Sequence, residues 1–170
     1  MANVDLSRVP EYYHKYVNLA IDDDIDSAFE KHRKELVSFL KEIPRKKWNY
    51  RYAEGKWSIK GVVQHIIDAE RVFSYRALCF ARKDQTPLPS FDENVFADNS
   101  KADKRTKKDL LKELELVQRS SAQLFKSFDD EQLQQPGVAS GKPVYVKGVA
   151  YILLGHALHH KKILEERYLK

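Results

Sequence analysis

Apolar side chains recur every three to four positions in four long segments of the chain, the spacing that places them on one face of a helix. The first segment follows an aspartate run, Asp22–Asp24, that can cap a helix, and it stops at Pro44. The second follows Ser58, a good N-terminal cap. The four helices predicted on this basis are Ile25–Ile43, Ile59–Arg82, Asp103–Phe128 and Val144–Leu169.

The stretches between these helices carry most of the prolines and glycines. We expect a polar connection at Arg45–Lys56, a long crossover at Lys83–Lys101, a loop at Pro136–Pro143 and a short leading helix at Pro10–Asn18. A crossover of this length in a small domain is usually functional or covers a site. Residues 1–170 are therefore predicted to form a single all-α domain, a four-helix bundle with a long crossover loop, antiparallel long helices and no substantial sheet.

The composition is that of a folded domain with a modest positive charge. The chain has 170 residues, of which 42% are hydrophobic and 32% charged, and a formal net charge of +5. Its one cysteine, Cys79, cannot form an internal disulfide, which favours a reducing compartment and a cytoplasmic location. No apolar run approaches the length of a membrane helix, and the N-terminus lacks the apolar core of a signal peptide. We therefore expect no membrane partner.

The positive charge raises nucleic acid as a partner. However, the densest basic stretch, Lys101–Lys108, contains Asp103 and no aromatic residue. Elsewhere basic residues alternate with acidic ones, as in Glu30–Glu35. This pattern is typical of a solvated surface of mixed charge, so no nucleic-acid partner is expected.

Three histidines occupy the apolar faces of two predicted helices. His156 and His160 are four residues apart on the last helix, on the same face as its aliphatic residues, and His65 faces inward from the second helix. Three imidazoles from two facing helices could bind a metal and leave a position open, as in catalytic sites. His159 is an alternative ligand to His160. The competing interpretation is that these are hydrogen-bonded core histidines, whereas His32 lies in a polar context and is expected on the surface.

Several motifs resemble the DinB-like (YfiT-like) superfamily. Trp57-Ser58 is followed by His65, Asp68 and Glu70, which is similar to the pattern W-S-x₆-H-x-x-D-x-E of that superfamily. The stretch Gly155–His160 is similar to its H-x-x-x-H motif on the last helix, and Phe91-Asp92-Glu93-Asn94 also resembles a stretch in many members. The resemblance extends over the whole chain, in order and at compatible spacing.

The resemblance implies a four-helix bundle that binds nickel or zinc through His65, His156 and His160. Members are commonly described as metal-dependent hydrolases, and relatives include thiol S-transferases that use bacillithiol and mycothiol-dependent isomerases. Many members dimerise, so a homodimer is expected.

Acidic residues near these motifs are candidates for catalysis. Asp68 lies one turn after His65 and could orient a ligand imidazole or act on bound water, but it could equally pair with Arg71 or Arg76. In the crossover, Asp92 or Glu93 could serve as a general base, and the alternative is a cap on a loop. Glu70 is expected on the surface. We select Asp68 and Glu93 as the catalytic candidates.

Two classes of function follow from these residues. The first is a metal enzyme: hydrolysis of a small molecule by metal-activated water ranks first, and transfer of a low-molecular-weight thiol, held by the Phe91–Phe96 crossover, ranks second. The second class is a non-catalytic metal-binding bundle. The substrate and the metal are not specified by the sequence.

Overall fold

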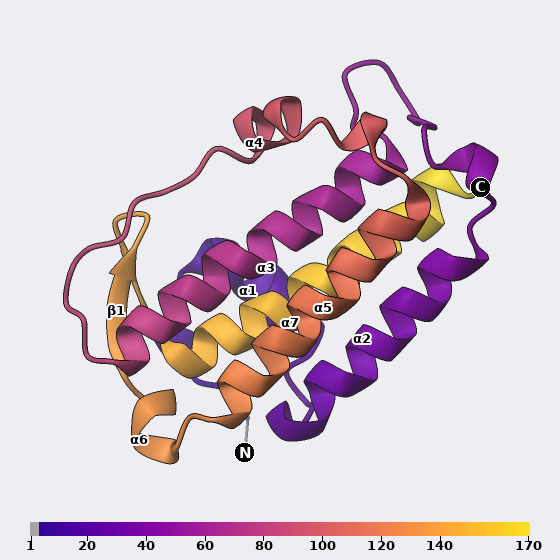
Figure 1. The fold of residues 1–170 in the computed structure, drawn as a ribbon. Helices are drawn as coiled ribbons and strands as arrows, with labels where there is room; N and C mark the ends of the chain where they lie inside the picture. The colour runs from indigo at the N-terminus through magenta and orange to yellow at the C-terminus, as the bar shows by residue number, and fades with distance from the viewer. Residues whose placement is uncertain (1–3) are drawn as a thin grey trace.

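The computed structural model describes residues 4–170, and four long helices dominate it (Figure 1). Three of them begin at side-chain caps: Asp24, Ser58 and Thr106 each accept a hydrogen bond from a backbone N–H three residues further on. The sequence predicted all four helices, with boundaries that shift by a few residues. The helices are α2 (Ile25–Glu42), α3 (Ile59–Ala81), α5 (Lys107–Lys126) and α7 (Val146–Ile163).

The order of the helices around the bundle differs from their order in the chain. Helix α3 packs against α5 and α7, and α2 packs against the same two helices, so that α2 and α3 lie diagonally opposite each other. Helices α2 and α7 run in one direction, and α3 and α5 run in the other (Figure 1). The expected antiparallel arrangement therefore holds for α3 with α7 and for α2 with α5, whereas α3 with α5 and α2 with α7 are parallel neighbours.

The long crossover explains the parallel pairing of α3 with α5. Residues 82–106 return the chain along the outside of α3, so that α5 starts at the same end of the bundle as α3 (Figure 1). The crossover was expected to be a loop, but it contains the helix α4 (Glu93–Asn99). The side chain of Asp92 accepts hydrogen bonds from the backbone N–H groups of Asn94 and Val95, which confirms the capping role considered for this residue.

A hairpin replaces the loop that we predicted before the last helix. Strands β1 (Pro136–Ala139) and β2 (Lys142–Tyr145) pair antiparallel, with Pro136 opposite Tyr145. The two turn residues, Ser140 and Gly141, both have positive φ, as a tight two-residue hairpin turn requires. Leu88 in the crossover exchanges backbone hydrogen bonds with Val138 and Ser140, so the hairpin anchors the crossover.

Short helical turns complete the described chain, and one of them contributes to the site. The predicted leading helix is present as a 3₁₀ turn followed by α1 (His14–Val17), which packs on α7. None of the helices in residues 4–170 has the length and apolar character needed to cross a bilayer. The other short elements are η1 (Leu6–Arg8), η2 (Glu11–Tyr13), η3 (Arg45–Lys47), η4 (Ala102–Lys104), α6 (Asp130–Leu133) and the π-helical turn η5 (Leu164–Tyr168).

The buried apolar side chains form two clusters, one towards each end of the bundle. On α3 the change from one cluster to the other falls between Ile67 and Ala69, and on α7 it falls between Leu154 and Ala157. Both positions lie beside a histidine that was predicted to face inward, His65 or His156. The polar centre of the bundle is therefore enclosed by apolar packing on both sides.

Gly155 permits the close packing of α1 on α7. A Cβ atom added at this position would overlap the backbone oxygen of Tyr16. We expect Gly155→Ala to lower the free energy of unfolding by about 3 kcal/mol, because the obstacle is backbone and cannot rotate away. The measurement is urea unfolding followed by circular dichroism.

A matched control for this substitution is Gly55→Ala. Gly55 has positive φ, but nothing lies within 4 Å of the position that a Cβ atom would take, so the expected cost is about 1 kcal/mol from backbone strain alone. Equal losses of stability in the two variants would show that the contact between α1 and α7 can relax.

Candidate metal centre

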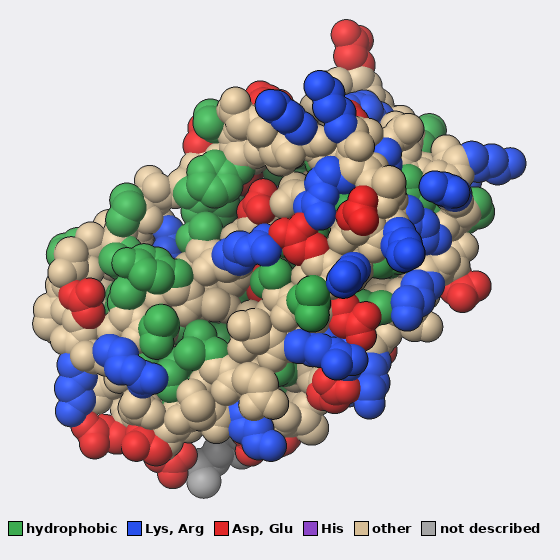
Figure 2. All heavy atoms as spheres, in the orientation of Figure 1, with side chains coloured by type: hydrophobic (Ala, Val, Ile, Leu, Met, Phe, Trp, Pro, Cys, Tyr) green, Lys and Arg blue, Asp and Glu red, His purple; other side chains and the backbone are tan. Residues whose placement is uncertain are grey.

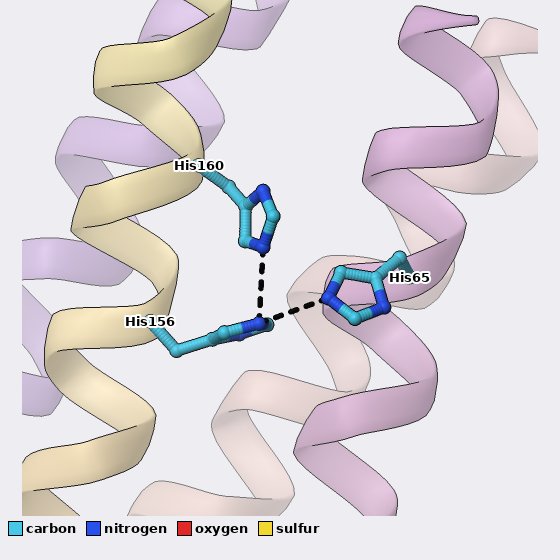
Figure 3. A group of neighbouring side chains, drawn as sticks. All are labelled: His65, His156 and His160. Atoms are coloured by element: carbon cyan, nitrogen blue, oxygen red, sulfur yellow. Dashed lines mark hydrogen bonds between the residues drawn. The ribbon is translucent and has the colours of Figure 1, made fainter. Parts of the chain in front are cut away.

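Three imidazoles meet between α3 and α7 (Figure 3). The Nε2 atom of His156 lies 2.9 Å from the Nε2 atom of His65 and 3.0 Å from that of His160. A ligand atom from each of the three residues lies within 4.8 Å of the other two. The structure thus brings together the three residues that the sequence singled out.

Local helix geometry explains the convergence. His156 and His160 are one turn apart on α7, so their side chains leave the same face of the helix. Helix α3 runs antiparallel beside α7 and presents His65 from the opposite side (Figure 3). His156 is buried, and His65 and His160 are partly buried.

Burial keeps these imidazoles neutral. It lowers the pKa of His65 to about 4 and the pKa values of His156 and His160 well below the usual value. The neighbouring imidazoles lower the pKa of His156 further, because two positive charges at this separation repel. Near neutral pH, the three rings therefore offer lone pairs, which is the protonation state that metal binding requires.

The donor set fits a cation better than it fits hydrogen bonding within the protein. The Nε2 atom of His156 has two close nitrogen neighbours, but it carries either one proton or one lone pair, so it cannot make a good hydrogen bond to both. Two nitrogens bound to the same tetrahedral zinc ion, each at about 2.0–2.1 Å, lie about 3.3 Å apart. The observed separations are near that value. A divalent cation would use all three lone pairs at once.

Aromatic rings surround the three histidines. The ring centroid of Trp57 lies 4.8 Å from that of His65, and the ring of Tyr16 in α1 lies 5.6 Å from that of His156. His159, the alternative ligand, packs against Tyr16 at 5.0 Å and is not part of the converging group. The structure therefore favours His160 over the alternative His159.

A pocket of about 100 Å³ opens beside His65 and His156. Its walls come from the N-terminal segment, α3, the crossover, the hairpin turn and α7, and they are mostly aromatic. Sequence reasoning identified Glu93 and the crossover that carries Phe91, but not the other wall residues; the aromatic cluster of the leading helix was the available signal for the tyrosines. The other lining residues are Tyr12, Tyr13, Tyr16, Ala69, Phe73, Phe91, Glu93, Ser140 and Ile152.

The two catalytic candidates lie in different surroundings. Glu93 lines the pocket, and its charge raises the pKa of His65 against the effect of burial. Asp68 does not line this pocket; it accepts a hydrogen bond from Gln64 at 2.9 Å, and burial raises its pKa. Its alternative partner Arg71 forms an ion pair with Glu113 at 2.7 Å. Glu93 is thus the candidate that shares the pocket with His65 and His156, and the catalytic roles of both carboxylates stay predictions.

Two residues expected on the surface are buried. Glu70 is 3% exposed at the interface of α3 and α5, where burial raises its pKa to about 7 and Ser121 and Gln118 partly offset this by hydrogen bonding. His32 is 6% exposed and lies 2.8 Å from a carboxylate oxygen of Asp23. Both predictions were wrong because polar neighbours in the sequence do not exclude an inward direction on a helix.

Hydrophobic and basic side chains are distributed unevenly over the surface around the site. Figure 2 shows exposed hydrophobic groups around the crossover and many lysine and arginine side chains on the opposite half of the same face. The exposed apolar residues near the pocket include Tyr12, Val95 and Phe96. The basic stretch Lys101–Lys108, which suggested nucleic acid as a partner, is itself paired in part, since Arg105 forms an ion pair with Glu113.

Comparison with known proteins identifies the family and a solved structure of similar fold. A model of the DinB superfamily matches residues 28–164. The fold is similar to YfiT from Bacillus subtilis, described as a probable metal-dependent hydrolase with an unusual four-helix bundle topology. The TM-score is 0.71 at 15% sequence identity, over 92% of this chain and 86% of the YfiT chain. No curated protein sequence gives a significant match.

Proposed function

This chain belongs to the DinB superfamily, and from that premise we propose that it is a metal-dependent hydrolase whose His65, His156 and His160 hold one divalent cation, zinc or nickel. The observation that carries the proposal is the convergence of three neutral imidazole nitrogens beside a pocket. A cation held there supplies Lewis acidity, which lowers the pKa of water or of a thiol. The proposed substrate is a small molecule, because the pocket is small.

The residues around the imidazoles have distinct proposed tasks. Glu93 accepts a proton from the attacking water, since its carboxylate is the acidic group that lines the pocket with His65. Phe73 and Ile152 contribute apolar walls that restrict water. Tyr16, packed edge-on against His156, fixes the orientation of that ring. These tasks depend on the packing of α1, α3, α4 and α7 around the pocket, because each helix contributes one of these side chains.

The proposed function is tested by assaying metal-loaded protein on aryl esters and aryl halides, with and without low-molecular-weight thiols. Hydrolysis that disappears in His156→Ala supports the proposal. Turnover that requires the thiol and disappears in the same variant would replace it with thiol transfer. No turnover under any condition, with metal bound, would favour a non-catalytic bundle.

The two carboxylate candidates can be separated by neutral substitutions of the same shape. We expect Glu93→Gln to lower kcat about 100-fold or more, with little change in metal affinity, because it removes a proton acceptor beside the pocket. We expect Asp68→Asn to change kcat less than tenfold, because its carboxylate is bound to Gln64. Steady-state kinetics at equal metal occupancy is the measurement. The reverse ranking would assign the base to Asp68.

A homodimer also stays a proposal that comes from the family resemblance. Light scattering over a range of protein concentrations is its test, and a monomer at every concentration would contradict it.

A further inference from the structure

Arg76 on α3 is a buried cation without an acidic partner. The residue is 3% exposed. Within residues 4–170, no carboxylate oxygen lies within 4.0 Å of its guanidinium nitrogens, although five other arginines form such pairs. A guanidinium does not lose its proton in a protein, so the charge persists. An unpaired charge away from water is costly unless something compensates for it.

The other buried arginine of the described chain shows the usual solution. Arg33 on α2 is 5% exposed, and its guanidinium contacts Glu30 at 2.6 Å and Glu115 at 3.1 Å. Arg76 is buried to the same degree but has only neutral partners. The difference points to a missing anion at Arg76.

The neutral partners of Arg76 lie in the pocket wall or next to it, and the side chain of Tyr13 is one of those in the wall. Its Nη2 atom donates to the backbone oxygen of Pro89 at 2.8 Å and lies 3.1 Å from Oγ of Ser140. Its guanidinium carbon lies 5.1 Å from the ring centroid of Phe73 and 5.8 Å from that of Phe91. Phe73, Phe91 and Ser140 all line the pocket that contains His65 and His156. The cation therefore stands behind the aromatic wall of that pocket.

The pocket continues outward past Ser140, the residue of the hairpin turn that Arg76 contacts. A second hollow of about 410 Å³ lies between the N-terminal segment and the hairpin, and it shares Tyr12, Tyr13 and Ser140 with the pocket of the histidines. Lys142 lines its far side. A ligand longer than the inner pocket thus has room to extend past the hairpin turn, towards the side chains of Lys142 and Glu11.

We propose that Arg76 binds a carboxylate group of the substrate, whose apolar or aromatic body lies between Tyr13, Phe73 and Phe91 and whose reactive end faces the histidines. The planar guanidinium suits a carboxylate because it can donate two parallel hydrogen bonds. This inference rests on the proposed function in one respect only, namely that the reactive end of the substrate faces the histidines. Binding of the carboxylate itself requires no metal.

A purely structural role would also use the contacts to Pro89 and Ser140, because they join the crossover to the hairpin turn. That role needs hydrogen-bond donors but no charge. A substrate anchor needs the charge. Ligands that differ only in charge therefore separate the two roles in the wild-type protein, without any substitution.

The experiment uses metal-free protein and phenylalkanoates with one to four methylene groups, each compared with its uncharged amide. Isothermal titration calorimetry gives the affinities, and backbone NMR shifts map the contact. We expect at least one carboxylate to bind about tenfold or more tightly than its amide. We also expect Arg76→Gln to remove the difference, Arg82→Gln to retain it, and the shifts to centre on Ser140 and Phe91.

Failure of this proposal is distinct from failure of the metal site. Three results would overturn the carboxylate anchor, whatever the metal affinity. Carboxylates and amides could bind equally, no ligand of the series could bind, or Arg76→Gln could still bind carboxylates more tightly than amides by the wild-type factor. If Arg76→Gln does not fold, Arg76→Lys replaces it, and we expect a smaller preference for carboxylates over amides. Ligand-induced NMR shifts that do not include the hairpin turn would also overturn the proposal. Loss of metal binding in His156→Ala, measured separately, concerns the proposed function alone.

Discussion

Replacing His156 by alanine is expected to lower the affinity for zinc or nickel by about 100-fold or more, because even partners outside the ligand set change metal affinity 10–100-fold. His156 is the central residue of the group, with its Nε2 atom close to both other Nε2 atoms. Metal bound only to the folded state also stabilises it, by about 2.7 kcal/mol at a free concentration 100 times Kd. The variant should lose most of this metal-dependent rise in Tm.

His159→Ala is the matched control, because His159 neighbours the group on the same helix but does not converge with it. We expect this variant to retain the metal affinity within about threefold. Fluorescence provides a readout independent of activity, since Trp57 lies against His65. Full metal affinity in His65→Ala, His156→Ala and His160→Ala alike would show that the ion binds elsewhere.

The second large effect is expected at Glu70, through the dependence of stability on pH. Its pKa rises from the ordinary 4.5 to about 7 in the folded protein, where burial disfavours the charged form. Between these pH values the folded state holds a proton that the unfolded state has released, so stability falls as pH rises. The loss reaches about 3 kcal/mol and is constant above about pH 7.

Glu70→Gln should remove this loss while keeping the shape of the side chain. We expect the variant and the wild type to have similar free energies of unfolding near pH 4.5, and the variant to be more stable at pH 8. The comparison uses chelator-treated protein, and the difference between the two proteins at each pH cancels contributions from the histidines. Glu131→Gln on the exposed surface is the control. A flat difference for Glu70→Gln would mean that water reaches its carboxyl.

Two packing features of the fold build the walls of the candidate metal centre. Gly155 lets α1 approach α7, and this approach places Tyr16 against His156. The hairpin holds the crossover at Leu88, and the crossover carries Phe91 and Glu93 to the pocket. Segments that are distant in the chain therefore form the walls around the three imidazoles. Substitutions far from the histidines can change the pocket without touching a ligand.

The sequence alone determined the helices and singled out the three histidines that converge in the candidate site. Apolar spacing, capping residues and prolines act over a few positions, so α2, α3, α5 and α7 follow from local patterns. The same local geometry places His156 and His160 on one face of α7, and the inward face of α3 carries His65. These predictions needed no knowledge of which helices are neighbours.

Only the tertiary structure decided the remaining features. The parallel pairing of α3 with α5 depends on the path of the crossover, and the hairpin depends on positive φ at Ser140 as well as Gly141. Glu70 and Arg76 both lie on α3 in stretches that look amphipathic, yet each is buried because another element covers it. Burial and charge pairing arise between segments far apart in the chain, and a local pattern in a single sequence contains no record of those distances.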